Sequence, residues 1–232
     1  MNKKQDIIFW GVVILFFLPF FISDKVYHFY LDFNHAHGMV MAFIKFAILA
    51  TLGEVIGQRI KTGKYFQPGF GILPRMIVWG FLGLTIKIAF LIFATGTPVL
   101  LEYLGMKGAL SAFSEPLGGK KIMVAFFTSS AMNLVYAPVM MTFHKITDNH
   151  ILSTGGTLRG FFSPIPIGKI FVNLNWDVMW NFVFKKTIPF FWIPAHTITF
   201  LLPPDWQVLF AALLGIALGT ILAVADMTEK KE

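Results

Sequence analysis

Long apolar runs separated by short polar connections restrict the fold of this chain more than any other feature of its sequence. A helix needs about 20 mostly apolar residues to cross the hydrocarbon core of a bilayer. Six runs come near that length, at residues 7–22, 38–56, 76–99, 122–143, 188–202 and 206–225. The first and the fifth are short and contain proline, so the sequence predicts five to six transmembrane helices.

The composition agrees with membrane insertion. Of the 232 residues, 13% are charged and 56% are hydrophobic, whereas about 25% of the residues in soluble domains are charged. This balance excludes an ordinary soluble enzyme and a disordered chain. Cysteine is absent, which excludes a disulfide framework, a thiolate nucleophile and an iron–sulfur cluster. We expect an all-α, polytopic helical bundle in which residues 1–232 form a single integral membrane domain.

The basic residues are distributed unevenly between the connections. With six spans, the connections on the side of the two termini hold 13 Lys and Arg residues, and those on the other side hold four. Because Lys and Arg collect on the cytoplasmic side, both termini are predicted to be cytoplasmic, in a bacterial inner membrane or in an organelle membrane of a eukaryote. The net charge of +7 then indicates contact with membrane lipids rather than with nucleic acid. Alternatively, the first run is a cleaved signal peptide, although no small-residue cleavage site follows it.

The connection at residues 144–187 is predicted to contain a loop and then an amphipathic helix. Gly155-Gly156 and the segment 163–166 break helices. From residue 170 to residue 184, Asn173, Asp177 and Asn181 recur at every fourth position between apolar residues, which is typical of a helix with a narrow polar stripe. This helix would lie flat at the membrane interface, or its Asp177 would line a water-filled cavity.

Three ionisable residues fall inside the apolar runs. At a rise of 1.5 Å per residue from the 57–75 connection, Lys45 lies roughly 17–18 Å deep, Lys87 roughly 16–17 Å, and Glu54 only about 4–5 Å. Two unpaired cations near the midplane favour a hydrated cavity that attracts anions. Asn133 and His196, each near the middle of its run, would add polar wall. The alternative is that these groups are packed and satisfied inside the bundle.

Glu54 and one face of the last run have structural interpretations. Because Glu54 is shallow, we expect a structural ion pair with Arg75 near the interface. Small residues four apart share one face of the last run, namely Ala211, Gly215, Gly219 and Ala223. Small faces let helix backbones approach closely in lipid. We expect this face to pack inside the monomer, with homo-oligomer formation as the less favoured use.

Several short motifs resemble one known family. They are the segment 53–58 (Gly-Glu-Val-Ile-Gly-Gln), Arg75, Gly80, Gly83, Tyr136-Ala137-Pro138, Pro194, residues 200–204 and the segment 207–210 (Gln-Val-Leu-Phe). In their order and spacing they are similar to the family of the twenty-two-kilodalton peroxisomal membrane protein and its mitochondrial relative Mpv-seventeen, over residues 50–225. This sequence departs from the family pattern at Glu54, which replaces Asp, and at Ile193, which replaces Trp. The resemblance implies a small helical membrane protein tied to solute passage, with no catalytic residues and no cofactor.

The sequence therefore predicts a channel or passive transporter for small solutes, anionic ones among them. Its partners would be membrane lipids and the solute. One alternative is a structural or assembly protein of the membrane. A less favoured alternative is a membrane-embedded, metal-dependent enzyme that uses His35 and His37, which follow Asp32 at the start of the second run. Residues two apart point the same way only in extended backbone, so this metal site is a weak candidate.

Overall fold

The computed structural model describes residues 3–229, with side-chain surroundings up to residue 220. Every regular element in this range is helical. The elements are α1 (Lys3–Phe17), α2 (Pro19–Ile22), α3 (Asp24–Ala36), α4 (Gly38–Thr62), α5 (Ile72–Tyr103), the 3₁₀ turn η1 (Ala112–Ser114), α6 (Gly119–Ser153), α7 (Leu158–Phe161), α8 (Ile167–Val172), α9 (Trp176–Val178), the π-helix η2 (Met179–Trp192), α10 (Ile193–Leu201) and α11 (Pro204–Glu229). The all-helical class predicted from the sequence is confirmed for the described residues.

Three helices are long and apolar enough to cross a membrane, namely α4, α5 and α6. They contain the second, third and fourth apolar runs of the sequence. The apolar part of α11 within the described side chains, Pro204–Thr220, is shorter. By their length and composition, these three helices indicate that the chain associates with a membrane.

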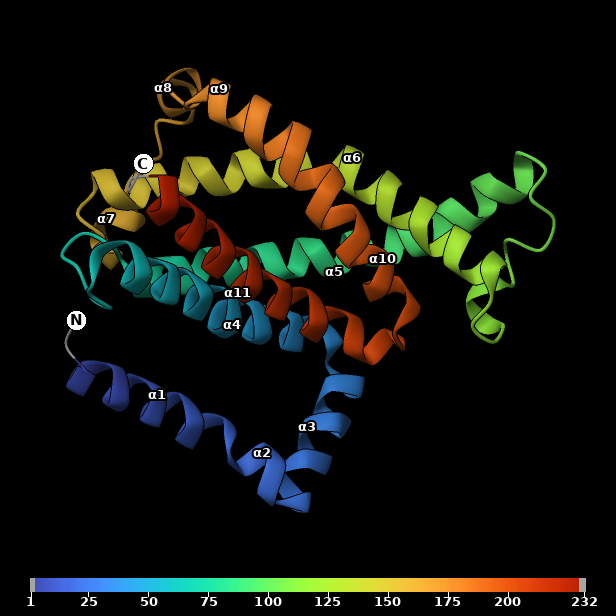
Figure 1. Ribbon diagram of the computed structural model, residues 1–232, viewed down its shortest axis with the longest axis horizontal. Helices are drawn as coiled ribbons and strands as arrows, with labels where there is room; N and C mark the ends of the chain where they lie inside the picture. Colours follow the sequence, from blue (N-terminus) through green and yellow to red (C-terminus); the bar gives the residue numbers. More distant parts are fainter. Residues whose placement is uncertain (1–2, 230–232) are drawn as a thin grey trace.

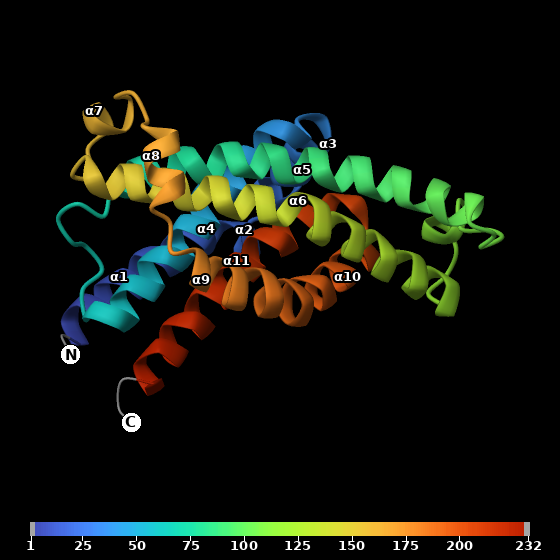
Figure 2. The same ribbon diagram turned by 90° about the horizontal axis from the view of Figure 1, so that it is seen from above.

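The helices α4, α5, α6 and α11 run along the long axis of the molecule (Figure 1), and α5 and α6 lie side by side in the view from above (Figure 2). The helix α11 packs along α4. Buried apolar residues from all four helices form the main core, among them Phe46, Phe90, Met132 and Ala212.

Glycines bring the backbones of these helices close together. A Cβ atom on Gly53 of α4 would lie 2.8 Å from the Cα atom of Ile216 in α11. A Cβ atom on Gly83 of α5 would lie 2.6 Å from the carbonyl oxygen of Ala42 in α4. Close backbone approach of this kind gains dispersion contacts, which drive helix association in lipid.

The helix α6 extends past the end that the apolar run predicted. We expected a loop to begin at residue 144, but α6 continues to Ser153. It ends where Gly155 and Gly156 adopt φ angles of +72° and +69°, a left-handed conformation that terminates helices at low cost in glycine. The loss of hydrophobicity after Phe143 therefore does not mark the end of the helix.

The predicted amphipathic helix is interrupted. Residues 173–175 separate α8 from α9, because Asn175 caps α9: its Oδ1 atom accepts a hydrogen bond from the Val178 N–H at 3.1 Å. Asn173 instead donates to the Lys169 carbonyl at 2.8 Å. From Trp176 the chain is helical through η2 and α10 up to Leu201. The second part of the predicted amphipathic helix and the fifth apolar run thus belong to one helical segment.

The π-helix η2 is unusually long for its type, since most π-helices are single turns and many of them lie at functional sites. The N–H of Ile193 bonds the carbonyl of Ile188, five residues back. The Thr187 hydroxyl likewise donates to the Phe182 carbonyl at 3.3 Å. Pro189 lies inside this segment.

The N-terminal helices form an arm beside the bundle (Figure 1, blue). Leu18 separates α1 from α2, which begins at Pro19, as expected for a proline. Most α1 side chains are exposed. Two polar contacts and one ring contact tie the start of α1 to the bundle: Asp6 bonds Arg59 and Tyr65, each at 2.8 Å, and Phe9 stacks on the Tyr65 ring.

Candidate functional site

A cavity of about 330 Å³ lies between the long helices. The helices α4, α5, α6 and α11 line it together with η2 and α10. Its wall is mainly apolar and rich in methionine, with Met132, Met140, Met141 and Met179. The exposed Lys145 also lines it, so the cavity reaches the surface there.

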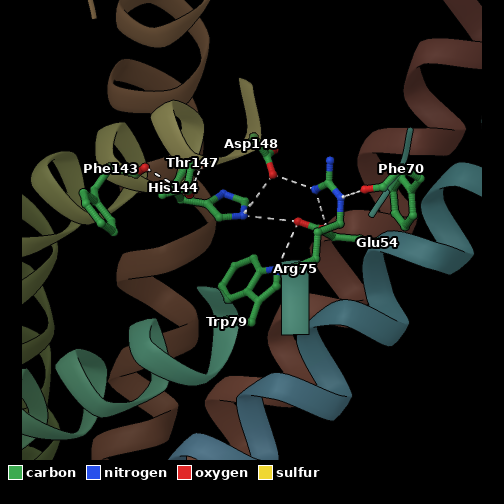
Figure 3. A network of polar contacts seen from close by, with 8 residues as sticks. All are labelled: Glu54, Phe70, Arg75, Trp79, Phe143, His144, Thr147 and Asp148. Carbon is green, nitrogen blue, oxygen red and sulfur yellow. Dashed lines mark hydrogen bonds and ion pairs between the residues drawn. The ribbon is translucent and has the colours of Figure 1, made fainter. Parts of the chain in front are cut away.

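One end of the cavity is polar, and Figure 3 shows the network of contacts between the side chains there. Glu54, His144 and Asp148 line it there. His144 Nε2 lies 3.2 Å from Glu54 Oε1 and 3.7 Å from Asp148 Oδ1. Trp79 donates from its indole N–H to Glu54 Oε1 at 3.0 Å, and its ring lies 4.4 Å from the His144 ring. A carboxylate from α4 thus meets an imidazole and a second carboxylate from α6.

Arg75 joins the two carboxylates from behind. Its Nη1 atom donates to Glu54 Oε2 and to Asp148 Oδ1, each at 2.6 Å, and its Nε atom donates to the Phe70 carbonyl at 2.8 Å. The Arg75 side chain is only 6% exposed, and it does not line the cavity. The two carboxylates therefore line the cavity directly, and they separate the Arg75 guanidinium from it.

Helical spacing explains how the sequence builds this cluster. Arg75 and Trp79 are four residues apart on α5, and His144 and Asp148 are four residues apart on α6, so each pair shares one helix face. Glu54 faces both pairs from α4. The predicted partners Glu54 and Arg75 lie in contact. Glu54 also lines the cavity, which its assignment to a structural pair near the interface did not anticipate.

His144 and Asp148 were not predicted as site residues, because both were expected to lie in a loop. The signal available was their spacing of four residues directly after an apolar helix, which continues the face of α6. The three groups Glu54, His144 and Asp148 are the one set of metal-type ligands within the described residues, with ligand atoms within 4.8 Å of one another. Arg75 already occupies the position between the two carboxylates, so we assign no metal to them.

A second polar group lies farther along the cavity. Asn133 and His196, two of the candidates from the sequence, line it, and both are buried. Asn133 donates from Nδ2 to the Ser129 carbonyl at 2.9 Å, and its amide group also contacts His196 Nδ1, which lies 3.1 Å from Nδ2 and 3.2 Å from Oδ1. The Trp192 ring stacks on His196, and its buried Nε1 atom has no hydrogen-bond partner. This wall therefore offers the unpaired N–H of Trp192 and the Nε2 atom of His196 for hydrogen bonds.

The two lysines predicted to line the cavity lie elsewhere. Lys45 is buried, donates to Asn34 Oδ1 at 2.5 Å and lies over the Tyr30 ring. The side chain of Lys87 passes near Gly38, at the start of α4. Neither lysine lines the cavity. The prediction used depth alone, whereas Lys45 points to α3, whose position the sequence did not specify.

Three other candidates also lie away from the cavity. Asp177 is exposed and accepts a hydrogen bond from Asn181 at 2.6 Å. His35 and His37 are exposed at the end of α3, and His37 contacts the Phe33 ring. None of the three belongs to the set of metal-type ligands described above.

The small face of α11 packs inside the monomer. Ala211 is 3% exposed. A Cβ atom on Gly215 would lie 3.9 Å from that of Ala50, and one on Gly219 would lie 3.3 Å from the Gly53 carbonyl oxygen. The side chain of Ala223 lies outside the residues whose side chains the structure describes. The small face of α11 therefore packs against α4.

No family model, curated protein or solved structure matches this chain.

Proposed function

We propose that this chain is a polytopic membrane protein that passes a small solute through its central cavity, as a channel or passive transporter. The observation that carries the proposal is the cavity of about 330 Å³ with Glu54, His144 and Asp148 in its wall. Charged groups inside a membrane are costly, and those that face a cavity mark solute or ion pathways. A volume at the lower end of the usual range for ligand pockets fits a small solute.

The resemblance to the Mpv-seventeen family supports this proposal. Three residues that carry it have defined places around the cavity. Gly53 of α4 allows the close approach of α11, and Gly83 of α5 allows the close approach of α4. Arg75 bonds the two carboxylates. The family's association with solute passage thus falls on the part of the chain that surrounds the cavity.

The proposal does not include a preference for anions. That preference depended on Lys45 and Lys87, and neither lines the cavity. We retain the five to six spans, the cytoplasmic termini and the bacterial inner membrane, or an organelle membrane, as parts of the proposal, with α4, α5 and α6 as three of the spans. The solute and the surrounding lipids are the proposed partners.

A flux assay with a cavity-filling variant tests the proposal. Val183 lines the cavity, whereas Val135 is 65% exposed on α6 and does not line it. The release of small neutral, cationic and anionic solutes from liposomes that contain the purified protein is measured, and some of these solutes should be released faster than others. Val183→Trp should reduce that release at least tenfold, and Val135→Trp should leave it unchanged. Equal flux through both variants, with both folded, would show that solutes do not use the cavity.

A further inference from the structure

We infer that the cavity binds small organic amines in their protonated form, and that a proton on His144 competes with them. The inference rests on the proposed function, because it names the solute class for the same cavity. It starts from the charges at the polar end. Two carboxylates, Glu54 and Asp148, share one guanidinium, Arg75. With a neutral His144, this cluster has one negative charge in excess.

The excess charge faces the cavity. Glu54 and Asp148 line it, whereas Arg75 lies behind them; Lys145 lines it too, but its side chain is exposed to solvent. A cation in the cavity would therefore lie closer to the carboxylates than to the guanidinium, and attraction is strongest at short distance in a medium of low dielectric constant. The ring of Trp79, beside the carboxylates, adds an aromatic face of the kind that attracts ammonium groups.

The remainder of the cavity suits an apolar body with a hydrogen-bond acceptor. Its wall is mainly methionine, aromatic and aliphatic side chains. The Trp192 indole N–H is buried without an acceptor, and a buried unpaired donor costs free energy that a ligand acceptor would recover. Near it, His196 is 8% exposed and uses only Nδ1 in its contact with Asn133. These groups are independent of the acidic cluster and point to a ligand that is apolar in its middle.

His144 can take the place of the amine. Its Nε2 atom lies between Glu54 Oε1 and Asp148 Oδ1, so protonation of the ring supplies one positive charge and balances the cluster. The charged groups around it are Glu54 from α4, Arg75 from α5, and Lys145 and Asp148 from α6. Among the described residues, η2 and α11 bring no charged group to the cavity wall. Amine binding then releases one proton from His144 to water.

Calorimetric titration of the full chain in detergent with phenethylammonium tests this inference without a variant. In two buffers of different ionisation enthalpy, binding should release up to one proton per amine, and the affinity should fall as the pH falls. The neutral isostere 2-phenylethanol should bind at least tenfold more weakly, and 3-phenylpropionate more weakly still. Equal binding of the alcohol would overturn the inference. Amine binding that releases no proton at any pH from 5 to 8 would also overturn it.

Two variants assign the proton. His144→Gln keeps a hydrogen-bond donor beside Glu54 and should bind the amine with an affinity that no longer depends on pH and with no proton release. The matched control His35→Gln changes an exposed histidine and should behave as the wild type. Proton release that persists in His144→Gln would remove His144 from the competition.

The results of the binding and flux assays distinguish a failure of the inference from a failure of the proposed function. Competitive amine binding without flux of any solute would overturn the proposed passage and leave the binding site. Flux of neutral or anionic solutes with no amine binding would overturn the inference and leave the passage.

Discussion

Arg75 is the residue on which the polar end of the cavity depends. Its guanidinium is 6% exposed and bonds both Glu54 and Asp148. Removing one partner of a buried pair leaves an uncompensated charge, which costs far more than the net contribution of the pair itself.

We predict that Arg75→Met destabilises the protein by about 3–5 kcal/mol, because two carboxylates then lie together without a cation. Glu54→Gln should cost less, about 1–3 kcal/mol, because Arg75 keeps Asp148 and the amide still accepts from Trp79. Unfolding in detergent followed by circular dichroism measures both values. Lys145→Met, at an exposed site, is the control and should change stability by less than about 0.5 kcal/mol. A larger loss in Glu54→Gln than in Arg75→Met would contradict this order.

The contact of Asp6 with the bundle predicts a pH dependence. Asp6 precedes the first apolar run, and its hydrogen bonds from Arg59 and Tyr65 lower its pKa from 3.8 to about 2. A carboxyl whose pKa is lower in the folded state stabilises that state above the unfolded pKa. The stabilisation should therefore be complete above about pH 4 and be lost between about pH 4 and pH 2.

Hydrogen exchange of α1 measures the Asp6 contribution. Exchange should be constant from pH 8 to pH 5 after correction for the intrinsic rate. Asp6→Asn should raise α1 exchange in that whole range, whereas the exposed Asp24→Asn should not. Protection of α1 that is unchanged in Asp6→Asn would show that this contact does not hold the arm.

Part of the polar cluster could be predicted from individual residues. The depth of Glu54 and the motif around it indicated Arg75 as a partner, and both lie in contact. The partner of Lys45 could not be predicted, because Asn34 comes from α3 and reaches Lys45 only after the arm has folded back. Contacts between distant segments depend on packing, which spacing along one helix does not encode.

At the scale of helices, the contact of α4 with α11 leaves no room for a side chain at Gly53. We predict that Gly53→Ala destabilises the protein by about 1–3 kcal/mol, because its Cβ atom meets the backbone of Ile216 at 2.8 Å and α11 must shift. A Cβ atom on Gly11 would have no heavy atom within 4 Å, so Gly11→Ala should be neutral or stabilising by up to about 1 kcal/mol. Thermal unfolding in detergent compares the two. Equal stability of both variants would show that α11 does not pack closely on α4.

Helix boundaries were predicted well where a backbone signal marks them. Gly38 begins α4 as the sequence indicated. The boundary at residue 143 was wrong because it followed hydrophobicity, while Gly155 ends the helix. The break at residues 173–175 was missed because the prediction followed the recurrence of Asn173, Asp177 and Asn181, whereas Asn175, which lies outside that series, acts as a cap.

At the scale of the whole molecule, the path of the chain brings both described ends to one side. The start of α1, the connection before α5, α7, and the end of α11 lie at one end of the long axis (Figure 1), and the connection between α5 and α6 lies at the other. The cavity itself could not be predicted, because helices from several distant parts of the chain enclose it.

We predict that reporter fusions after residue 37 and at the C-terminus report opposite sides of the membrane. The excess of basic residues in the connections that share the side of the termini sets this orientation. Alkaline phosphatase and green fluorescent protein fusions measure it. Fusions that report the same side would contradict six spans and favour an odd number or a cleaved first span.

Because the sequence contains no cysteine, the proposed passage of solute through the cavity can be tested directly. Single cysteines at Val183, in the cavity wall, and at Val135, exposed on α6, are treated with a charged methanethiosulfonate reagent in liposomes. The reagent should label Val183→Cys and reduce its solute flux at least tenfold, bound solute should slow that labelling, and Val135→Cys should keep its flux. Full flux through Val183→Cys after complete labelling, as verified by mass spectrometry, would contradict the account.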